Sequence, residues 1–318
     1  MTLVLDIVHD TRYEYAAPVS LAHHLAHLQP LEDAHQQLLA YALDVDPAPA
    51  QHRDSRDAMG NAQRHFSLLQ PHGRLRVRAS SRVRVQPRFA GLQPALSPAW
   101  DAVADSLRYV ARAPFRTEVE FAMPSPYVPR LEVLRDYAAP TLRPRRPVVE
   151  AALELMHRIH ADYAYDGEST EIDTPLAQVV EHRRGVCQDF AHLMAGALRM
   201  WGLPARYVSG YLLTHAPEGG GPMLGADASH AWVQVWCPGT PGVPAEGGSA
   251  GWLDLDPTND LVPGSGHVRL AVGRDYTDVT PLRGVIRGGG GSHMLSVGVR
   301  TRVAEAGPRV ASVNPQES

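Results

Sequence analysis

The sequence has few cysteines and no long hydrophobic run. Two cysteines, Cys187 and Cys237, in 318 residues are too few for a disulfide framework, and no CxxC pair suggests a zinc or redox centre. No stretch of about 18 uncharged apolar residues is present, so we expect no membrane-spanning helix and no membrane partner. The opening MTLVLDIVHDTRYEY has no basic region and reaches Asp6 early, unlike a signal peptide. A reducing, cytoplasmic location is therefore expected.

Charge and composition narrow the class of protein further. The formal net charge is −4, so the chain as a whole has no attraction to nucleic acid. Hydrophobic residues make up 44% and charged residues 20%, as in ordinary soluble globular proteins. A chain of 318 residues can bury a substantial core and is long enough for two domains. No pattern in the sequence indicates an oligomeric state.

The hydrophobic pattern changes along the chain. Alternating runs such as TLVLDIVHDTRYEY, punctuated by Pro and Gly, predict a β-rich N-terminal domain over residues 1–95. Residues 96–303 first show helical spacing, as in PVVEAALELMHRIH, and later strand-like alternation, which predicts an α+β domain. Residues 304–318 are expected to form a flexible tail.

Five arginines alternate with apolar residues in GRLRVRASSRVRV, so a strand would carry them on one face: Arg74, Arg76, Arg78, Arg82 and Arg84. Such a stripe could bind a polyanion. It could also be a solvated face that protects the edge of a sheet from pairing with other chains. We favour the solvated face.

Cys187 stands where a helix begins. In RGVCQDFAHLMAGALRMWG, apolar residues recur at helical spacing after Cys187, and Gly202 followed by Pro204 ends the pattern. Backbone N–H groups and the positive end of the helix dipole favour a thiolate in this first turn. A backbone N–H there could also stabilise an oxyanion. A lone cysteine is more often a small buried hydrophobe, so a nucleophile needs a base and a group that orients the base.

The candidate base and its partner follow on two predicted strands. His230 opens the strand in SHAWVQVW, and GWLDLDPTND places Asp254 and Asp256 on one face of the next. If these strands are neighbours, a histidine and a carboxylate lie side by side against the N-terminus of the helix. Cys187 would then attack a carbonyl, His230 would take and return the proton, and an aspartate would hold the imidazole.

Three motifs occur in the order found in a known family. RRGVCQDFAHLMAGALRMWGLPARYVSGYL, SHAWVQVW and GWLDLDPTN resemble the bacterial transglutaminase-like cysteine enzymes. HDTRYEYAAPVSLAHHLAHLQP and DAMGN resemble their β-rich N-terminal domain, and HVRLAVGRDYTDVTPLRGVIRGGG resembles their C-terminal stretch. The resemblance implies an α+β, papain-like core over residues 96–303, in which a helix bearing the cysteine packs on an antiparallel sheet bearing histidine and aspartate.

The resemblance also implies roles for individual residues. Cys187 would be the nucleophile, His230 the base and Asp256 the residue that orients it, whereas the position of Asp254 is not acidic in the family. The chemistry would proceed through a thioester on a peptide or protein substrate, without a cofactor or metal.

Neighbours of these motifs could complete the cleft. Tyr165 could donate a hydrogen bond to an oxyanion, and Gln188 follows the nucleophile as it does in the bacterial members of the family. Trp232 is expected to wall the cleft and exclude water. The glycine-rich loop THAPEGGGPMLGADASH, just before His230, could close over the site.

Other functions remain open. A thioester intermediate can be hydrolysed, as in a peptidase or amidase, or passed to an amine, as in a cross-linking transglutaminase; we favour hydrolysis. A relative that binds peptides without turnover is a further alternative. His23 and His27 in AHHLAH are four residues apart and could bind zinc on a helix, but their flanks look like strand and loop, which disfavours a metal hydrolase.

Overall fold

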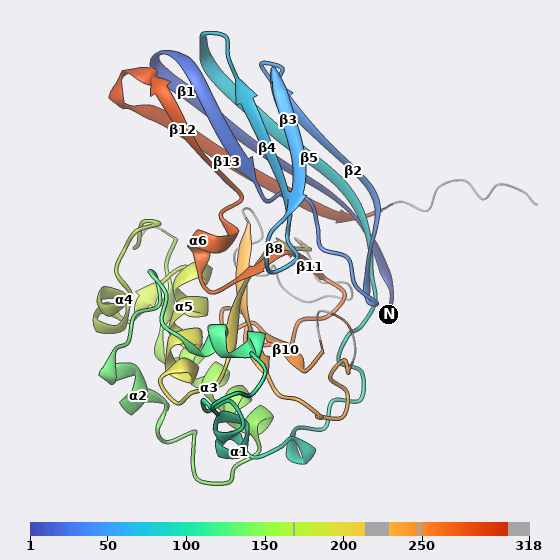
Figure 1. Cartoon of the computed structure of the whole chain (residues 1–318), viewed down its shortest axis with the longest axis vertical. Helices are drawn as coiled ribbons and strands as arrows, with labels where there is room; N and C mark the ends of the chain where they lie inside the picture. The colour runs from blue at the N-terminus through green and yellow to red at the C-terminus, as the bar shows by residue number, and fades with distance from the viewer. Residues whose placement is uncertain (168, 214–228, 246, 248–249, 305–318) are drawn as a thin grey trace, which may run out of the picture.

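The computed structural model of the chain describes residues 1–167, 169–213, 229–245, 247 and 250–304. Figure 1 shows a long β-sheet at one end of the molecule and a core of helices and strands at the other. The sheet has seven strands within the described residues: β1 (Leu3–Ala26), β2 (Gln36–Asp46), β3 (Gln51–Arg56), β4 (Ala62–Leu68), β5 (His72–Val85), β12 (Leu282–Gly288) and β13 (His293–Val303).

Strand β1 is the spine of this sheet. Its first half pairs with β5 on one side and β13 on the other, and its second half pairs with β4 and β12, all antiparallel. The division expected at residue 95 therefore leaves out part of the sheet, because β12 and β13 come from the region 96–303 and return to β1. Alternation fixes which face of a strand is buried, but it does not say which strands pair.

The arginine stripe lies on the solvent-facing side of β5. Arg76 and Arg82 pair with Asp10 and Asp6 of β1. Strand β5 lies between β1 and β2, so the stripe does not protect an edge as expected. Arg76 and Arg82 instead form cross-strand ion pairs on this solvent-facing side.

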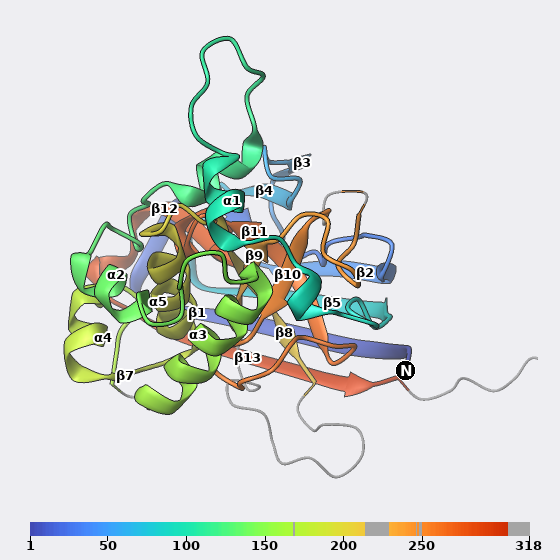
Figure 2. The same ribbon diagram turned by 90° about the horizontal axis from the view of Figure 1, so that it is seen from below.

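The core contains a four-stranded antiparallel sheet in the order β10-β9-β8-β11: β8 (Ala205–Leu212), β9 (His230–Trp236), β10 (Trp252–Leu255) and β11 (His267–Gly273). Helices α2 (Glu132–Ala138), α3 (Val148–Asp162), α4 (Leu176–His182) and α5 (Cys187–Arg199) lie together on one side of it (Figure 2). The short elements are α1 (Trp100–Asp105), α6 (Tyr276–Val279), β6 (Ala164–Tyr165), β7 (Arg184–Gly185) and the 3-10 turns Pro94–Leu96, Thr117–Ala122 and Gly289–Gly291.

Helix α5 is the central element of the core. It packs on β8 and β9 and is surrounded by α2, α3 and α4, so nearly all of its residues are buried. Small residues allow the neighbouring helices to approach closely: a Cβ added at Gly196 would lie 2.8 Å from Leu134 of α2. The interior position of α5 sets the place of its first residue, Cys187, in the fold.

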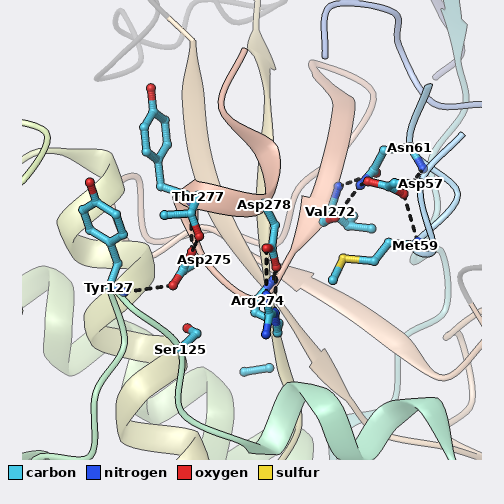
Figure 3. Close-up of polar contacts among 12 residues, drawn as sticks. Asp57, Met59, Asn61, Ser125, Tyr127, Val272, Arg274, Asp275, Thr277 and Asp278 are labelled. Atoms are coloured by element: carbon cyan, nitrogen blue, oxygen red, sulfur yellow. Dashed lines mark hydrogen bonds and ion pairs between the residues drawn. The ribbon is translucent and has the colours of Figure 1, made fainter. Parts of the chain in front are cut away.

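Apolar and polar contacts join the two parts of the molecule. Leu5 and Ile7 of β1 share a buried cluster with Tyr211 of β8 and Leu270 of β11. The side chain of Asn61 also bonds to the backbone of Val272 in β11, in the way that a paired strand would. Its Nδ2 donates to the Val272 carbonyl at 2.7 Å, and its Oδ1 accepts from the Val272 N–H at 2.8 Å (Figure 3). Asp57, at the start of the DAMGN motif, accepts a hydrogen bond from the same Nδ2 at 2.8 Å.

The histidines of AHHLAH belong to strand β1 and the residue just after it, not to a helix. His23 bonds to Ser67, whereas His27 bonds to the Thr280 carbonyl. Extended backbone sets residues 23 and 27 roughly 13 Å apart, too far to share a metal ion. Among the described residues, no helix combines the length and the apolar character that crossing a membrane requires.

Candidate active site

Hydrogen bonds around Asp189 position Cys187. The Asp189 carboxylate accepts from the Val186 N–H at 2.9 Å and from the Thr170 hydroxyl at 2.7 Å, which caps the first turn of α5. Gly185 allows this packing, because a Cβ there would lie 2.7 Å from the Asp189 carboxylate. Burial raises the pKa of Asp189. These contacts hold Cys187 at the mouth of the helix.

His230 and Asp256 meet because their strands are neighbours. His230 is the first residue of β9, and Asp256 follows the last residue of β10, which pairs with β9. His230 Nε2 lies 2.9 Å from Asp256 Oδ2, and both side chains are fully buried. The geometry indicates that Nε2–H donates to the carboxylate. His230 Nδ1 then faces away from Asp256, and no hydrogen bond to Nδ1 is found within the described part of the chain.

The charges of the site support one another. Burial alone would lower the pKa of His230, but the negative charge of Asp256, and next that of an ionised Cys187, raise it above its ordinary value. Burial alone would raise the pKa of Asp256, but the charge of His230 and hydrogen bonds from His230 and His267 keep it far below its usual range. The carboxylate of Asp256 and the imidazolium of His230 therefore favour each other's charged forms.

Asp256 receives more hydrogen bonds than a simple pair would give it. The backbone N–H groups of Thr258 and Asn259 donate to Oδ1 at 3.0 and 3.2 Å. The Asn259 amide donates to Oδ2 at 2.9 Å, and His267 Nε2 lies 3.2 Å from the same oxygen. The Asp-Pro-Thr-Asn turn thus holds the Asp256 carboxylate in place independently of its contact with His230.

Asp254 has a different partner. It is fully buried, and its Oδ2 accepts from Arg269 of β11 at 2.9–3.0 Å. Arg269 also pairs with Asp33 at 3.0 Å. Of the two aspartates that the strand pattern left open, the structure places Asp256 on His230 and Asp254 in an ion-pair network.

His267 is the residue of this site that sequence reasoning missed. It lies on β11, and its ring packs edge-on against Trp232 with centroids 5.4 Å apart. The stretch HVRLAVG shows only strand alternation, so nothing in it distinguishes a site residue. His230, Asp256 and His267 are also close enough to bind a metal ion, with ligand atoms within 4.8 Å of one another. These ligand atoms already take part in hydrogen bonds, because both histidines bond to the Asp256 carboxylate.

The other predicted site residues divide into two groups. Tyr165 and Gln188 line the same cavity as Cys187 and His230, and the Gln188 amide donates to the Ile172 carbonyl at 3.0 Å. Trp232 is fully buried and stacks beside the His230 ring with centroids 6.0 Å apart. It therefore packs against the imidazole and does not line the cavity. The loop expected to act as a lid, residues 214–228, lies outside the described residues.

Helix α6 adds a tyrosine to the cavity. Asp275 caps this helix, because its carboxylate accepts from the Thr277 N–H and from the Tyr127 N–H, each at 2.9 Å (Figure 3). The backbone N–H of Tyr276 donates to His192 Nε2 at 3.2 Å, which ties α6 to α5. Tyr276 is thereby held against the cavity.

The cavity has a volume of about 380 Å³ and walls from both parts of the molecule. One wall belongs to the core and carries the thiol and the imidazole. The other belongs to the N-terminal sheet and consists of residues of β1, β12 and β13: His9, Thr11, Tyr13, Leu282, Leu295 and Val297.

A helix that presents a cysteine to a histidine–aspartate pair on an antiparallel sheet, with a β-rich domain beside it, defines a transglutaminase-like protein of papain-like fold. Comparison with known families agrees: residues 5–84 match the bacterial transglutaminase-like N-terminal region, and residues 135–257 match the transglutaminase-like superfamily. The chain belongs to the family of bacterial transglutaminase-like proteins, as its motifs predicted.

Individual relatives extend this result. An uncharacterized protein of Mycobacterium tuberculosis H37Rv is 39% identical over 296 residues, which cover 92% of this chain and 90% of the relative. The crystal structure of a candidate cysteine protease from Cytophaga hutchinsonii superposes with a TM-score of 0.69 at 20% identity, over 96% of this chain and 92% of that one. This likeness confirms the predicted fold. A protein-glutamine gamma-glutamyltransferase of Pseudomonas aeruginosa is 29% identical over 136 residues, 42% of this chain and 19% of that protein.

Proposed function

We propose that the protein is a thiol-dependent acyl-transfer enzyme that cleaves amide or peptide bonds through a thioester on Cys187. One observation carries the proposal: His230, fixed by Asp256 through Nε2, lines the same cavity as Cys187. A cysteine at a helix N-terminus, a histidine and a buried carboxylate that fixes the histidine are the parts that nucleophilic acyl transfer requires.

The steps follow from the contacts. The Cys187 thiolate attacks the carbonyl carbon and forms a C–S bond. The C–N bond then breaks, and the leaving amine or ammonia takes a proton from the His230 imidazolium. Water attacks the thioester and gives one proton to His230, the C–S bond breaks, and the acid is released while the Cys187 thiolate and the His230 imidazolium are restored. Asp256 keeps Nε2 protonated, which leaves Nδ1 for these proton transfers. The backbone N–H of Cys187, in the first turn of α5, is our candidate oxyanion donor.

A protein-glutamine transglutaminase is the second candidate. The relative from Pseudomonas aeruginosa carries that name, and transfer of the acyl group to an amine uses the same three side chains as hydrolysis. We favour hydrolysis, because water needs no second binding site. The chain contains no lysine, so its own side chains offer no primary amine that could confuse an assay of amine incorporation.

The function is tested with a panel of peptides, each carrying an electrophile in place of the scissile amide, and with matched amide substrates. The proposal expects one covalent adduct per chain, mapped by mass spectrometry to Cys187, and cleaved or deamidated product from the matched amide. Cys237 serves as the internal control, because it is fully buried. Product bearing an added amine donor, formed faster than the hydrolysed product, would favour the transglutaminase. Adducts on neither cysteine would overturn both candidates.

A further inference from the structure

The N-terminal sheet forms the wall of the cavity that faces the thiol. In the pairing of β1 with β13, Thr11 lies opposite Val297 and Tyr13 opposite Leu295. All four residues share one face of the strand pair and line the cavity with Cys187 and His230. Figure 1 shows this part of the sheet above α6, on the side of the core where β8 ends.

This wall carries no charge that could match a charged substrate. Among the described residues that line the cavity, none is Asp, Glu, Arg or Lys. Burial lowers the pKa of His9 to about 4, which keeps its ring neutral, and burial raises the pKa of Tyr276 to about 12. A charged side chain bound here would lose its hydration without gaining a partner, which is strongly unfavourable.

The same wall exposes large apolar side chains to solvent. Leu295 is 46% exposed and Val297 is 42% exposed, although apolar residues of this size gain free energy from burial. The surface continues beyond the cavity as an aromatic group, in which Tyr13 and Tyr15 stack with centroids 6.1 Å apart and His293 lies 5.4 Å from Tyr13. Contiguous exposed apolar surface beside a catalytic group is typical of a ligand-binding groove.

We propose that this face of β1 and β13 is a specificity subsite, which binds an uncharged apolar or aromatic side chain next to the carbonyl that Cys187 attacks. The inference rests on the proposed function and adds the substrate class to it. The volume of about 380 Å³ is at the small end of ligand pockets, about 300–1,000 Å³, and suits one such side chain with its neighbouring backbone. The N-terminal sheet is then part of the active site and not a separate appendage.

The subsite is tested on the full chain with peptide electrophiles that differ at one residue, Phe, Leu, Gln, Glu or Arg, next to the reactive carbonyl. The rate of Cys187 modification is expected to be at least about 10-fold higher for Phe and Leu than for Glu and Arg, since apolar contacts discriminate by 10- to 200-fold. Equal rates across the series would overturn the subsite.

Two substitutions on one strand separate the subsite from general effects. Leu295→Asp places a carboxylate on the cavity face and is expected to lower the rate with the Phe probe about 10-fold while raising the rate with the Arg probe. Met294→Asp is the control, because Met294 is 68% exposed and points to the opposite face of β13. An unchanged preference in Leu295→Asp would contradict the proposal.

Modification by iodoacetamide distinguishes a failure of the subsite proposal from a failure of the proposed function. If peptide probes modify Cys187 rapidly but without selectivity, only the subsite is overturned. If iodoacetamide reacts at Cys187 while every peptide probe fails, the proposed function and the subsite are both overturned.

Discussion

The two walls of the cavity are built in opposite ways. On the core wall, His230 and Asp256 are fully buried, and the carboxylate is fixed by hydrogen bonds from Thr258, Asn259 and His267. On the sheet wall, Leu295 is nearly half exposed and no described residue carries a fixed charge. Proton transfer needs groups held in place, whereas recognition of an apolar side chain needs dehydrated surface of the right shape. This difference agrees with our proposal that one wall carries out the chemistry and the other selects the substrate.

The largest expected effect comes from the centre of the core wall. Asp256→Asn keeps the shape of the side chain but removes the charge that holds His230, and is expected to lower kcat/KM by about 10²- to 10⁴-fold. Asp254→Asn, two residues earlier on β10, is the matched control. It breaks the pair with Arg269 and should lower stability, while the rate per folded molecule changes little. Equal losses of kcat/KM in the two variants, measured at equal folded fraction, would contradict the assignment.

The pH dependence of kcat/KM gives a second test of the contact between Asp256 and His230. Asp256 raises the pKa of His230, so the imidazolium persists as pH rises and is lost only when pH passes this raised value. In Asp256→Asn that support is gone, so the alkaline limb of kcat/KM should move to lower pH. A limb that stays in place would show that the carboxylate does not set the charge of His230.

The next largest effect is expected on stability, from the hydrogen bonds that join Asn61 of the N-terminal part to Val272 of the core. Asn61→Ala removes both hydrogen bonds to Val272 and leaves buried backbone groups without partners, so we expect unfolding to become easier by about 2–4 kcal/mol. Denaturant melts measure this change. Arg53→Ala, on the exposed face of β3, serves as control and should melt like the original chain. An Asn61→Ala variant of unchanged stability would show that the sheet is held by its apolar cluster alone.

The smallest effect is expected on the solvent-facing side of the sheet, away from both walls. Arg82→Ala breaks the pair with Asp6, but Arg82 is half exposed and water screens the interaction. Neither the unfolding midpoint nor the rates with the peptide probes should change measurably. A selective loss of activity in Arg82→Ala would mean that the arginine stripe takes part in binding the substrate.

The core could be predicted from sequence because its motifs combine local signals. A glycine before Cys187, helical spacing after it and two strands with His230 and Asp256 predict the fold. The structure places Cys187 and His230 on one cavity and Asp256 on His230. Their catalytic roles stay predictions. The place of His267 in the site could not be predicted, because it is a single histidine on a strand with an ordinary alternating pattern. Its contact with Asp256 depends on the order of the strands in the sheet.

The sheet wall could not be predicted from sequence for a different reason. It forms where β13 pairs with β1, and these strands are separated by nearly the whole chain. Alternation in HMLSVGVRTRV predicts a strand with two faces, but not its partner or which face meets the thiol. The edge position expected for the arginine stripe failed for the same reason, since β2 covers that side of β5.

The most direct test is the rate at which iodoacetamide modifies Cys187 between about pH 5 and 9, in the original chain and in His230→Ala. Cys237, whose pKa burial raises to about 12, provides the unreactive reference. We predict that Cys187 is modified faster in the original chain than in His230→Ala, with the largest difference below about pH 8.5, where an unassisted thiol is mostly protonated and reacts slowly. The same slow, rising profile in both proteins would contradict the proposal that Cys187 and His230 act as one unit.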